Sequence, residues 1–485
     1  MYKQSFYLSI SKGLKSVSAL VITMIIARVL SQNEYGVYRQ FILYSTLLSG
    51  ILYFGIPTAV SYLFKTINKQ HISKLFTSTS ILLLFINIFS ALILVIFRDT
   101  FIDFVSKDGE ILNYYYLLIL YISSIIFFSF LENIFTSNND GESFAKFNII
   151  YFIIQLISFL YVSFIYKDLN IILILFVGLE TIKGILLYFL FKRKNNIKFE
   201  FDTKLIKKEW VIAVPIGISF IAQSLNSYLG NMYVSREYSV DDFAVFSVGV
   251  TEIPFISIIT LSIATAILPT LSEKYNKEKK PLEMLSIWNE STIISALLIF
   301  PIFWILFLFG DGYIEFIYSS EYIGAKSIFL IFLLKLPLAI TVFGNILIVL
   351  NKSKYILFNM VAAIIINITL IIILDKVFSL EGVALAAILT QFSLVVLTLI
   401  EIKVSLKVKV KTLFPLIRLC KIFLISGITV AGCYSVSLLI NFSNILSFFV
   451  FGGVSLFAVG IVFYFVGYLD KIIEKIKLKV RGKNE

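Results

Sequence analysis

Long hydrophobic runs separated by short polar stretches follow one another along the whole chain. Most runs contain about 20 residues, which is enough for a helix to cross a hydrocarbon layer about 30 Å thick. The pattern predicts an all-α polytopic membrane protein with about fourteen membrane-spanning helices. Their expected positions are 8–29, 37–63, 75–97, 112–135, 144–166, 169–191, 210–233, 243–270, 286–309, 324–350, 354–374, 380–402, 416–440 and 445–468.

A polar connector between two of these runs occurs twice. Residues 28–38 read RVLSQNEYGVY, and residues 236–246 read REYSVDDFAVF. The dipeptide Phe-Asn recurs at a similar offset, at 147–148 and 358–359. Such a repeat indicates duplication of a whole membrane half. Aligned without a gap, the two connectors match Arg28 with Arg236, Ser31 with Ser239, Glu34 with Asp242, Tyr35 with Phe243 and Gly36 with Ala244.

The duplication divides the chain into two six-helix lobes and a C-terminal addition. The first lobe, which ends in a basic linker, covers residues 1–208, and the second lobe covers 209–402. Residues 403–485 add two helices and a basic tail outside the repeat. Because each connector joins the first two helices of its lobe, we expect a paired gate or hinge. Gly36 and Ala244 are the small residues where backbones could bend or approach closely.

Composition agrees with a membrane protein and changes how the charge is interpreted. The chain is 59% hydrophobic and 15% charged, with a mean hydropathy of +0.94, whereas soluble proteins are about half apolar and a quarter charged. The net charge of +12 would suggest nucleic acid in a soluble protein. Here the basic residues concentrate in alternate loops and the tail, which the positive-inside rule explains without a nucleic-acid partner.

The loop charges predict multi-pass insertion in a bacterial cytoplasmic membrane with both termini in the cytoplasm. The even-numbered loops are rich in lysine, most strongly between residues 192 and 208, whereas the odd-numbered loops carry more acids. The fourth loop is the exception, since it should be cytoplasmic but is surrounded by Glu132, Asp140, Glu142 and Lys146.

No set of residues suggests catalysis, a metal site or a nucleotide site. His71 is the single histidine, and the chain has no GxxxxGK[ST] motif for nucleotide phosphates. No predicted outer loop is large enough for a catalytic domain. We therefore expect a protein that is not an enzyme and has no cofactor. The candidate driving forces are H⁺, Na⁺ and the membrane potential.

Several short motifs carry a resemblance to a known family. They are Ala27–Leu30 and Glu34–Tyr38 in the first half, and residues 244–247, 267–272, 346–354, 367 and 381–386 in the second. Over residues 5–402 the chain resembles the bacterial polysaccharide-biosynthesis (O-antigen-type) flippases of the multidrug/oligosaccharidyl-lipid/polysaccharide exporter superfamily. Many relatives have an acid followed by Arg late in helix 7, where this chain has Asn226 and Asn231, so no charge role is carried over there.

The resemblance implies two six-helix lobes that face a central cavity and open it to each side in turn. The implied substrate is an undecaprenyl-diphosphate-linked oligosaccharide, flipped from the inner to the outer leaflet for surface polysaccharide assembly. The implied partners are this substrate and the lipid bilayer, with the polysaccharide polymerase machinery as a further candidate.

Ionisable residues within predicted helices are the candidates for substrate contact, because each costs about 3 kcal/mol to insert at mid-membrane. Lys12 and Lys15 share one helix face, and they could meet the diphosphate or snorkel to lipid headgroups. Lys335 lies near mid-depth, two residues before Pro337, which can kink the helix. It could contact an anion, form a gating pair or form a structural ion pair. Glu252 could pair with a cavity lysine, bind a coupling ion or be structural.

The remaining candidates concern pairing and gating. The i, i+3 spacing of Glu180 and Lys183 favours mutual neutralisation. Arg28 and Arg39 flank the first connector, where they could anchor it at the membrane interface. Alternatively, they could hold the diphosphate or seal an outer gate with Glu34.

An oligosaccharide flippase is therefore the leading hypothesis, and two alternatives in the same superfamily stay open. An ion-coupled multidrug exporter would favour an acidic, cation-binding first lobe, whereas the first helix carries Lys12 and Lys15. A lipid II flippase would share the fold. A membrane polymerase or ligase would need a sizeable outer loop with paired acids or arginines, which the sequence lacks.

Overall fold

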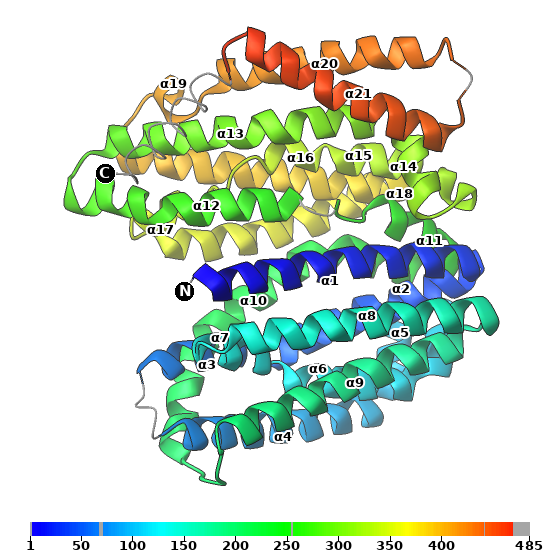
Figure 1. Ribbon diagram of the computed structural model, residues 1–485, viewed down its shortest axis with the longest axis vertical. Helices are drawn as coiled ribbons and strands as arrows, with labels where there is room; N and C mark the ends of the chain where they lie inside the picture. Colours follow the sequence, from blue (N-terminus) through cyan, green and yellow to red (C-terminus); the bar gives the residue numbers. More distant parts are fainter. Residues whose placement is uncertain (1, 67–70, 254–255, 441, 469–485) are drawn as a thin grey trace. The chain divides into compact units, whose positions relative to one another are not determined.

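The computed structural model describes residues 2–66, 71–253, 256–440 and 442–468, and over these residues the chain forms helices and no strands. Contacts divide the chain into two compact units, whose helices are labelled in Figure 1. Unit 1 comprises residues 1–248 and 360–376, and unit 2 comprises residues 249–359 and 377–485. These units differ from the halves of the sequence repeat, whose boundaries stay a prediction.

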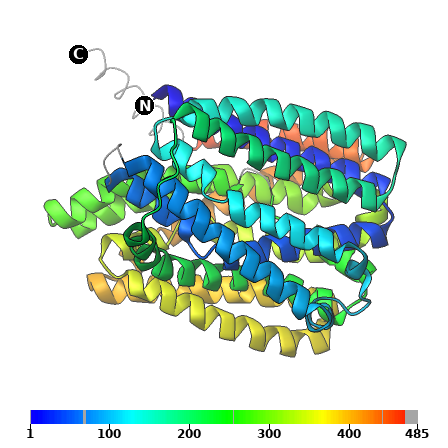
Figure 2. The same ribbon diagram turned by 90° about the horizontal axis from the view of Figure 1, so that it is seen from below.

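Unit 1 is a helical bundle with an aromatic core. Helix α1 packs along α8, α6 along α9, and α10 against α2 and α3, and Figure 2 shows the bundle from below. The ring centroids of Phe130, Tyr188 and Phe191 lie 4.9–5.4 Å from that of Phe76. The helices of this unit are α1 (Tyr2–Val29), α2 (Gln32–Leu52), α3 (Ile56–Thr66), α4 (Ile72–Ile96), α5 (Arg98–Val105), α6 (Tyr115–Phe128), α7 (Leu131–Ser137), α8 (Gly141–Ile165), α9 (Leu169–Lys194), α10 (Thr203–Glu237), most of α11 (Val240–Gly249) and residues 360–376 of α18 (Ser353–Leu406).

Unit 2 is organised around α13. This helix packs against α12, α20 and α21, and α20 packs along α21 (Figure 1). Trp304 of α13 donates a hydrogen bond from Nε1 to the backbone oxygen of Phe423 in α20, at 2.9 Å. Besides the ends of α18, the α-helices of this unit are α12 (Ile256–Ser272), α13 (Pro281–Leu308), α14 (Gly310–Ile317), α15 (Lys326–Leu333), α16 (Lys335–Leu338), α17 (Gly344–Val349), α19 (Val410–Leu413), α20 (Leu416–Ser437) and α21 (Asn444–Phe465).

The helices confirm an all-helical polytopic membrane fold. In the described part of the chain, 10 helices are long and apolar enough to cross a membrane. The count becomes 11 if α2 and α3, which are bent by 44°, form one span. The expected number of fourteen is therefore not confirmed and stays a prediction.

Several predicted helices are interrupted within their expected bounds. The predicted helix 37–63 breaks at Phe54 and Gly55, which have φ of 46° and 73°. A Cβ on Gly55 would lie 2.8 Å from the Ala213 oxygen of α10, so this break fits closely against α10. The predicted helix 324–350 is divided into α15, α16 and α17. The two helices predicted at 354–374 and 380–402 correspond to the two parts of α18, which meet at a kink at Ser379 (φ 50°, ψ −130°).

Candidate functional site

Lys335 and Glu252 form an ion pair within unit 2. Lys335 is the first residue of α16, and Glu252 lies in the stretch between α11 and α12. The Lys335 Nζ atom is 2.7 Å from Glu252 Oε1 and 5.1 Å from the centroid of the Phe332 ring. The side chains keep 34% and 70% of their surface exposed, respectively. The pair therefore combines a close contact with access for a third group.

The pair lies at a cavity of about 120 Å³ within unit 2. Hydroxyls of Thr251, Ser257 and Thr260 are its other side-chain polar groups, and the remaining lining is apolar. Lys335 follows the end of α15 at Leu333, so the cation stands where the helix is broken. Broken membrane helices expose backbone groups beside binding sites in transporters. The arrangement can bind an anion at the ammonium or a proton at the carboxylate. The other lining residues are Ile253, Ile256, Phe329, Phe332, Leu333, Leu336 and Ala339.

Lys12 and Lys15 lie in unit 1, on α1. Both side chains are exposed. Among the described residues, neither side chain has an ion-pair or hydrogen-bond partner. A lysine without an acidic partner can interact with a phosphate of a lipid or of a substrate, so both interpretations of this pair remain available.

Glu180 and Lys183 neutralise each other on α9. Their Oε2 and Nζ atoms are 2.5 Å apart. Tyr151 of α8 donates a hydrogen bond from its hydroxyl to Glu180 Oε1 at 2.8 Å, and its ring centroid lies 4.7 Å from the Lys183 ammonium. The i, i+3 spacing predicted the ion pair. The contribution of Tyr151 depends on the packing of α8 against α9, which the sequence does not reveal.

The two connectors start helices with the same type of cap. Ser31 caps α2, and a capping box joins it to Glu34, whose carboxylate accepts hydrogen bonds from Ser31 N at 3.0 Å and Ser31 Oγ at 2.8 Å. At the start of α11, Ser239 Oγ accepts a hydrogen bond from the Asp242 N–H at 3.2 Å and donates one to Asp242 Oδ2 at 2.6 Å. Glu34 thus serves a helix start. Sequence reasoning recognised the repeat and missed its Ser-x-x-acid cap.

The connectors also touch each other within unit 1. Gln32 Nε2 donates to the backbone oxygen of Asp241 at 3.1 Å. One residue beyond the connectors, Arg39 Nη2 donates to the backbone oxygen of Ser247 at 3.4 Å. A Cβ on Gly36 would lie 2.4 Å from the Val240 backbone oxygen. The predicted close approach at Gly36 is therefore present, and the backbone of α11 is its neighbour.

Arg28 lies beside a cavity of about 420 Å³ between α1 and α8. Its Nη1 atom donates to the Met24 backbone oxygen at 3.1 Å. Lys167 is the second cation at this cavity, whose remaining lining is apolar. The position suits either of two predicted roles for Arg28, anchoring at the membrane interface or contact with a phosphate.

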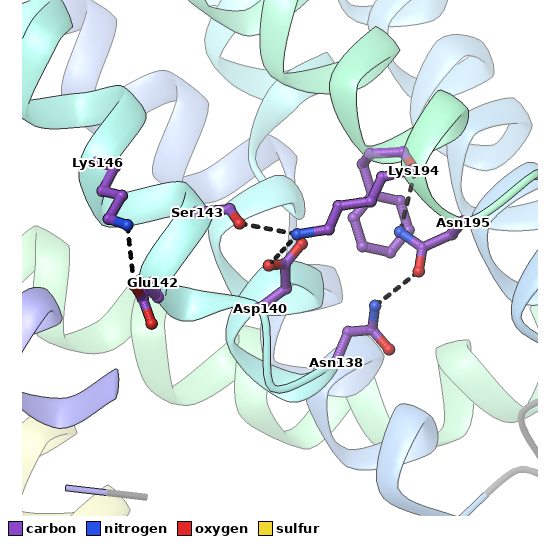
Figure 3. Close-up of polar contacts among 8 residues, drawn as sticks. Asn138, Asp140, Glu142, Ser143, Lys146, Lys194 and Asn195 are labelled. Carbon is purple, nitrogen blue, oxygen red and sulfur yellow. Dashed lines mark hydrogen bonds and ion pairs between the residues drawn. The ribbon is translucent and has the colours of Figure 1, made fainter. Parts of the chain in front are cut away.

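The fourth loop, which carries the exceptional acids, contacts the basic end of α9 and the residue after it. Lys194, the last residue of α9, contacts Asp140 Oδ1 at 2.6 Å and Ser143 Oγ at 2.8 Å (Figure 3). Asn138 donates to Asn195 Oδ1 at 2.8 Å in the same group. The fourth loop therefore lies at the same end of unit 1 as the linker, with Asp140 neutralised there. Figure 3 also shows Glu142 paired with Lys146, at 2.9 Å.

Glu209 is a buried carboxyl that sequence reasoning did not select. Its side chain is fully buried, and Thr79 of α4 donates a hydrogen bond to its Oε1 atom. Its Oε2 atom is buried without a hydrogen-bond partner in the described part of the chain. The lysines beside it, Lys207 and Lys208, suggested a solvated linker. Because α10 already begins at Thr203, the residue instead faces the bundle.

The fold defines the class of protein. It is similar to that of the lipid II flippase MurJ in an inward closed conformation, with a TM-score of 0.70 and 20% identity over 94% of this chain and 98% of that one. The fold is also similar to that of an inward-facing multidrug resistance MATE family transporter of the MOP superfamily. The TM-score is 0.56, with 14% identity over 81% of this chain and 96% of that one. For the Vibrio cholerae MATE transporter VcmN the TM-score is 0.53, with 11% identity over 85% of this chain and 100% of that one. The chain is thus a multi-pass membrane protein with the fold of these transporters.

A family model described as "Polysaccharide biosynthesis protein" matches residues 25–327, more than half of the chain. The chain therefore belongs to this family of polysaccharide biosynthesis proteins. A comparison with curated proteins finds no match. The predicted resemblance is confirmed at the level of family and fold.

Proposed function

We propose that this protein flips an undecaprenyl-diphosphate-linked oligosaccharide from the inner to the outer leaflet of the bacterial cytoplasmic membrane. Its role would be surface polysaccharide assembly, with O-antigen as one such product. Membership of the polysaccharide biosynthesis family carries this proposal. The fold, similar to that of a solved flippase, supports transport by alternating access. In this proposal the protein is a transporter and not an enzyme.

The Lys335–Glu252 pair is the proposed point of substrate contact or coupling. A diphosphate can compete with Glu252 for the ammonium, because the two side chains meet at an open cavity. Release of Glu252 would leave a carboxylate able to take up H⁺ or Na⁺, which links substrate binding to a driving ion without a cofactor. Lys12 and Lys15, whose side chains are exposed, are proposed as further cations for the diphosphate.

The proposed orientation has both termini in the cytoplasm. The lysine-rich even-numbered loops support it, and the Lys194–Asp140 contact accounts for the loop that departs from the rule. The connectors would then lie at the outer side, where the contact of Gln32 with Asp241 and that of Arg39 with Ser247, next to the connectors, support a gate. In the proposed scheme the two six-helix lobes arose by duplication, and Arg28 serves the outer interface.

Reconstitution tests the proposed function directly. The purified protein is placed in vesicles with labelled lipid-linked oligosaccharide from the producing strain, and label exposed on the outer leaflet is measured over time. We expect faster exposure than in protein-free vesicles and in vesicles with a heat-inactivated sample. Equal rates with a verified, folded protein would contradict the proposal.

Lipid II is the second candidate substrate, because the solved structure with a TM-score of 0.70 is a lipid II flippase. The same vesicles loaded with lipid II distinguish the two. Faster flipping of lipid II than of the oligosaccharide lipid would favour the second candidate. The multidrug exporter alternative predicts drug-dependent growth protection when the protein is expressed, which we do not expect.

A further inference from the structure

The linker segment, defined as residues 195–202, is fixed against α4 by hydroxyl groups. The backbone N–H of Lys198 donates to Ser73 Oγ at 3.2 Å, and its carbonyl accepts from Thr77 Oγ1 at 3.3 Å. Ser78 Oγ accepts from the Asp202 N–H at 3.0 Å. Ile197 is buried while Phe199 remains 81% exposed. These hydrogen bonds therefore fix the linker segment and its side chains at one end of unit 1.

A cavity of about 150 Å³ lies within unit 1 between this segment, α4, α6 and α9. Leu84 and Phe199 are 45% and 81% exposed, so the cavity is accessible from outside the bundle. Thr77 and Ser80 already use their hydroxyls on backbone oxygens. The apolar part of the lining consists of Phe76, Ile81, Leu84, Phe127, Tyr188, Ile197 and Phe199.

Two lysines complete the lining of this cavity. Lys192 lies in the last turn of α9, and Lys198 lies in the linker segment. Both are exposed, and among the described residues neither ammonium has an ion-pair or hydrogen-bond partner. Nearby Lys194 differs, because Asp140 neutralises it (Figure 3). The nearby acid Glu200 makes no ion pair with either lysine.

We propose that the linker cavity binds an anionic phospholipid, with its phosphate between Lys192 and Lys198 and its acyl chain along the apolar lining. Basic pockets at the ends of membrane helices suit anionic headgroups, and aromatic rings favour the same depth. None of the candidate transport residues Lys12, Lys15, Lys335 and Glu252 lines this cavity. The ligand we assign is therefore a resident membrane lipid and not the transported one.

Lipid titration of the full-length protein in neutral detergent tests this site. Binding of phosphatidylglycerol is followed by native mass spectrometry, with phosphatidylcholine and inorganic phosphate as reference ligands. The test variant is Lys192→Gln with Lys198→Gln. The matched control is Lys207→Gln with Lys208→Gln, which removes the same charge from exposed positions outside the cavity.

We expect phosphatidylglycerol to bind the unmodified protein and the control alike. Each lysine near an anionic surface contributes about a fivefold factor, so the test variant should bind roughly 30-fold more weakly. Equal weakening in test and control variants would show attraction to net charge alone and overturn the proposal. Equal binding of phosphatidylcholine would also overturn it. So would displacement of phosphatidylglycerol by inorganic phosphate with no contribution of the acyl chain to binding.

A shape-changing variant separates the cavity from its charges. Leu84→Trp fills the apolar lining and leaves both lysines in place. Because Leu84 is partly exposed, the larger ring can be accommodated without disturbing the core. We expect weaker phosphatidylglycerol binding with an unchanged unfolding temperature in lipid-free detergent. Unchanged binding in this variant would contradict an acyl chain in the cavity.

Discussion

The acids and lysines of this protein differ in how completely each is neutralised. Lys183 and Lys194 have close acidic partners. Lys335 also has a partner, but Glu252 keeps 70% of its side chain exposed beside a cavity. An exposed ion pair contributes about 0–1 kcal/mol to folding. The Lys335–Glu252 pair is therefore better suited to reversible contact than to holding the fold together.

Charge reversal distinguishes a structural pair from a functional one. We expect Lys335→Gln and Glu252→Gln to reduce flipping in reconstituted vesicles while changing the free energy of unfolding by about 1 kcal/mol or less. The double variant Lys335→Glu with Glu252→Lys restores the ion pair but exchanges the charges. Flipping by this double variant should remain impaired if the Lys335 ammonium contacts the substrate. Full recovery of flipping in the double variant would show that the pair acts only through its mutual attraction.

A different prediction applies to Glu209, because burying its carboxyl group costs free energy of folding. Glu209→Gln keeps a carbonyl oxygen for Thr79 and removes a buried acid whose Oε2 atom has no hydrogen-bond partner in the described part of the chain. We expect this variant to be at least as stable as the unmodified protein. Thr79→Val removes the hydrogen bond and should lower stability by about 1–3 kcal/mol. Thermal unfolding in detergent measures both, and a large loss in Glu209→Gln would indicate a required negative charge.

Lys335 and Glu252 could be selected from the sequence, because a charged residue inside an apolar run is recognised without knowledge of the fold. The Glu180–Lys183 pair was identified for the same reason, through helical spacing. Glu209 was missed, because the neighbouring lysines in the sequence indicated an exposed position. Tyr151 was missed because its role depends on which helix lies beside α9. Partners distant in the sequence require the fold.

At the scale of elements, the repeated connector acts as a helix start. Ser31 with Glu34, and Ser239 with Asp242, satisfy backbone N–H groups that α2 and α11 would otherwise leave unpaired. The aligned acids are thus explained by local structure. The small residue Gly36 is explained by packing, since it meets the backbone of Val240 at the start of α11.

Gly36 and Gly13 give a matched pair of substitutions. A Cβ at Gly36 would lie 2.4 Å from a backbone oxygen, whereas a Cβ at Gly13 has nothing within 4 Å. We expect Gly36→Ala to lower the free energy of unfolding by about 1–3 kcal/mol through overpacking. Gly13→Ala should leave it unchanged or raise it slightly, because alanine favours helices. Similar unfolding temperatures for the two variants would contradict the close contact.

Hydropathy predicted where helices lie better than where they break. A hydropathy average runs over many residues, so it does not register the positive φ of Phe54. The break at Ser379, by contrast, lies in the gap between the helices predicted at 354–374 and 380–402. Pro337 did indicate a disturbance near Lys335, and the structure divides that helix into three pieces. A broken helix can cross the membrane or re-enter it, so the number of apolar runs need not equal the number of membrane crossings.

At the scale of the whole molecule, the orientation in the membrane can be tested by cysteine labelling. In a Cys420→Ser, Cys433→Ser background, Arg193→Cys and Glu142→Cys probe the linker end, and Glu237→Cys probes the connector end. We expect a membrane-impermeant thiol reagent added to intact cells to label position 237 alone. Labelling of all three in permeabilised cells is the control for reactivity. Labelling at 142 but not 193 from outside would contradict their shared end.

The composition of unit 1 has a consequence for engineering this protein. The repeat invites the construction of chimaeras that exchange residues 1–208 with the corresponding half of a relative. Yet residues 209–248 belong to the same compact unit as that half, and α10 packs there against α2, α3 and α4. A graft at the repeat boundary would therefore place foreign side chains throughout a continuous interior. Recombination that transfers residues 1–248 and 360–376 together preserves that interior, even though it cuts across the predicted halves of the repeat.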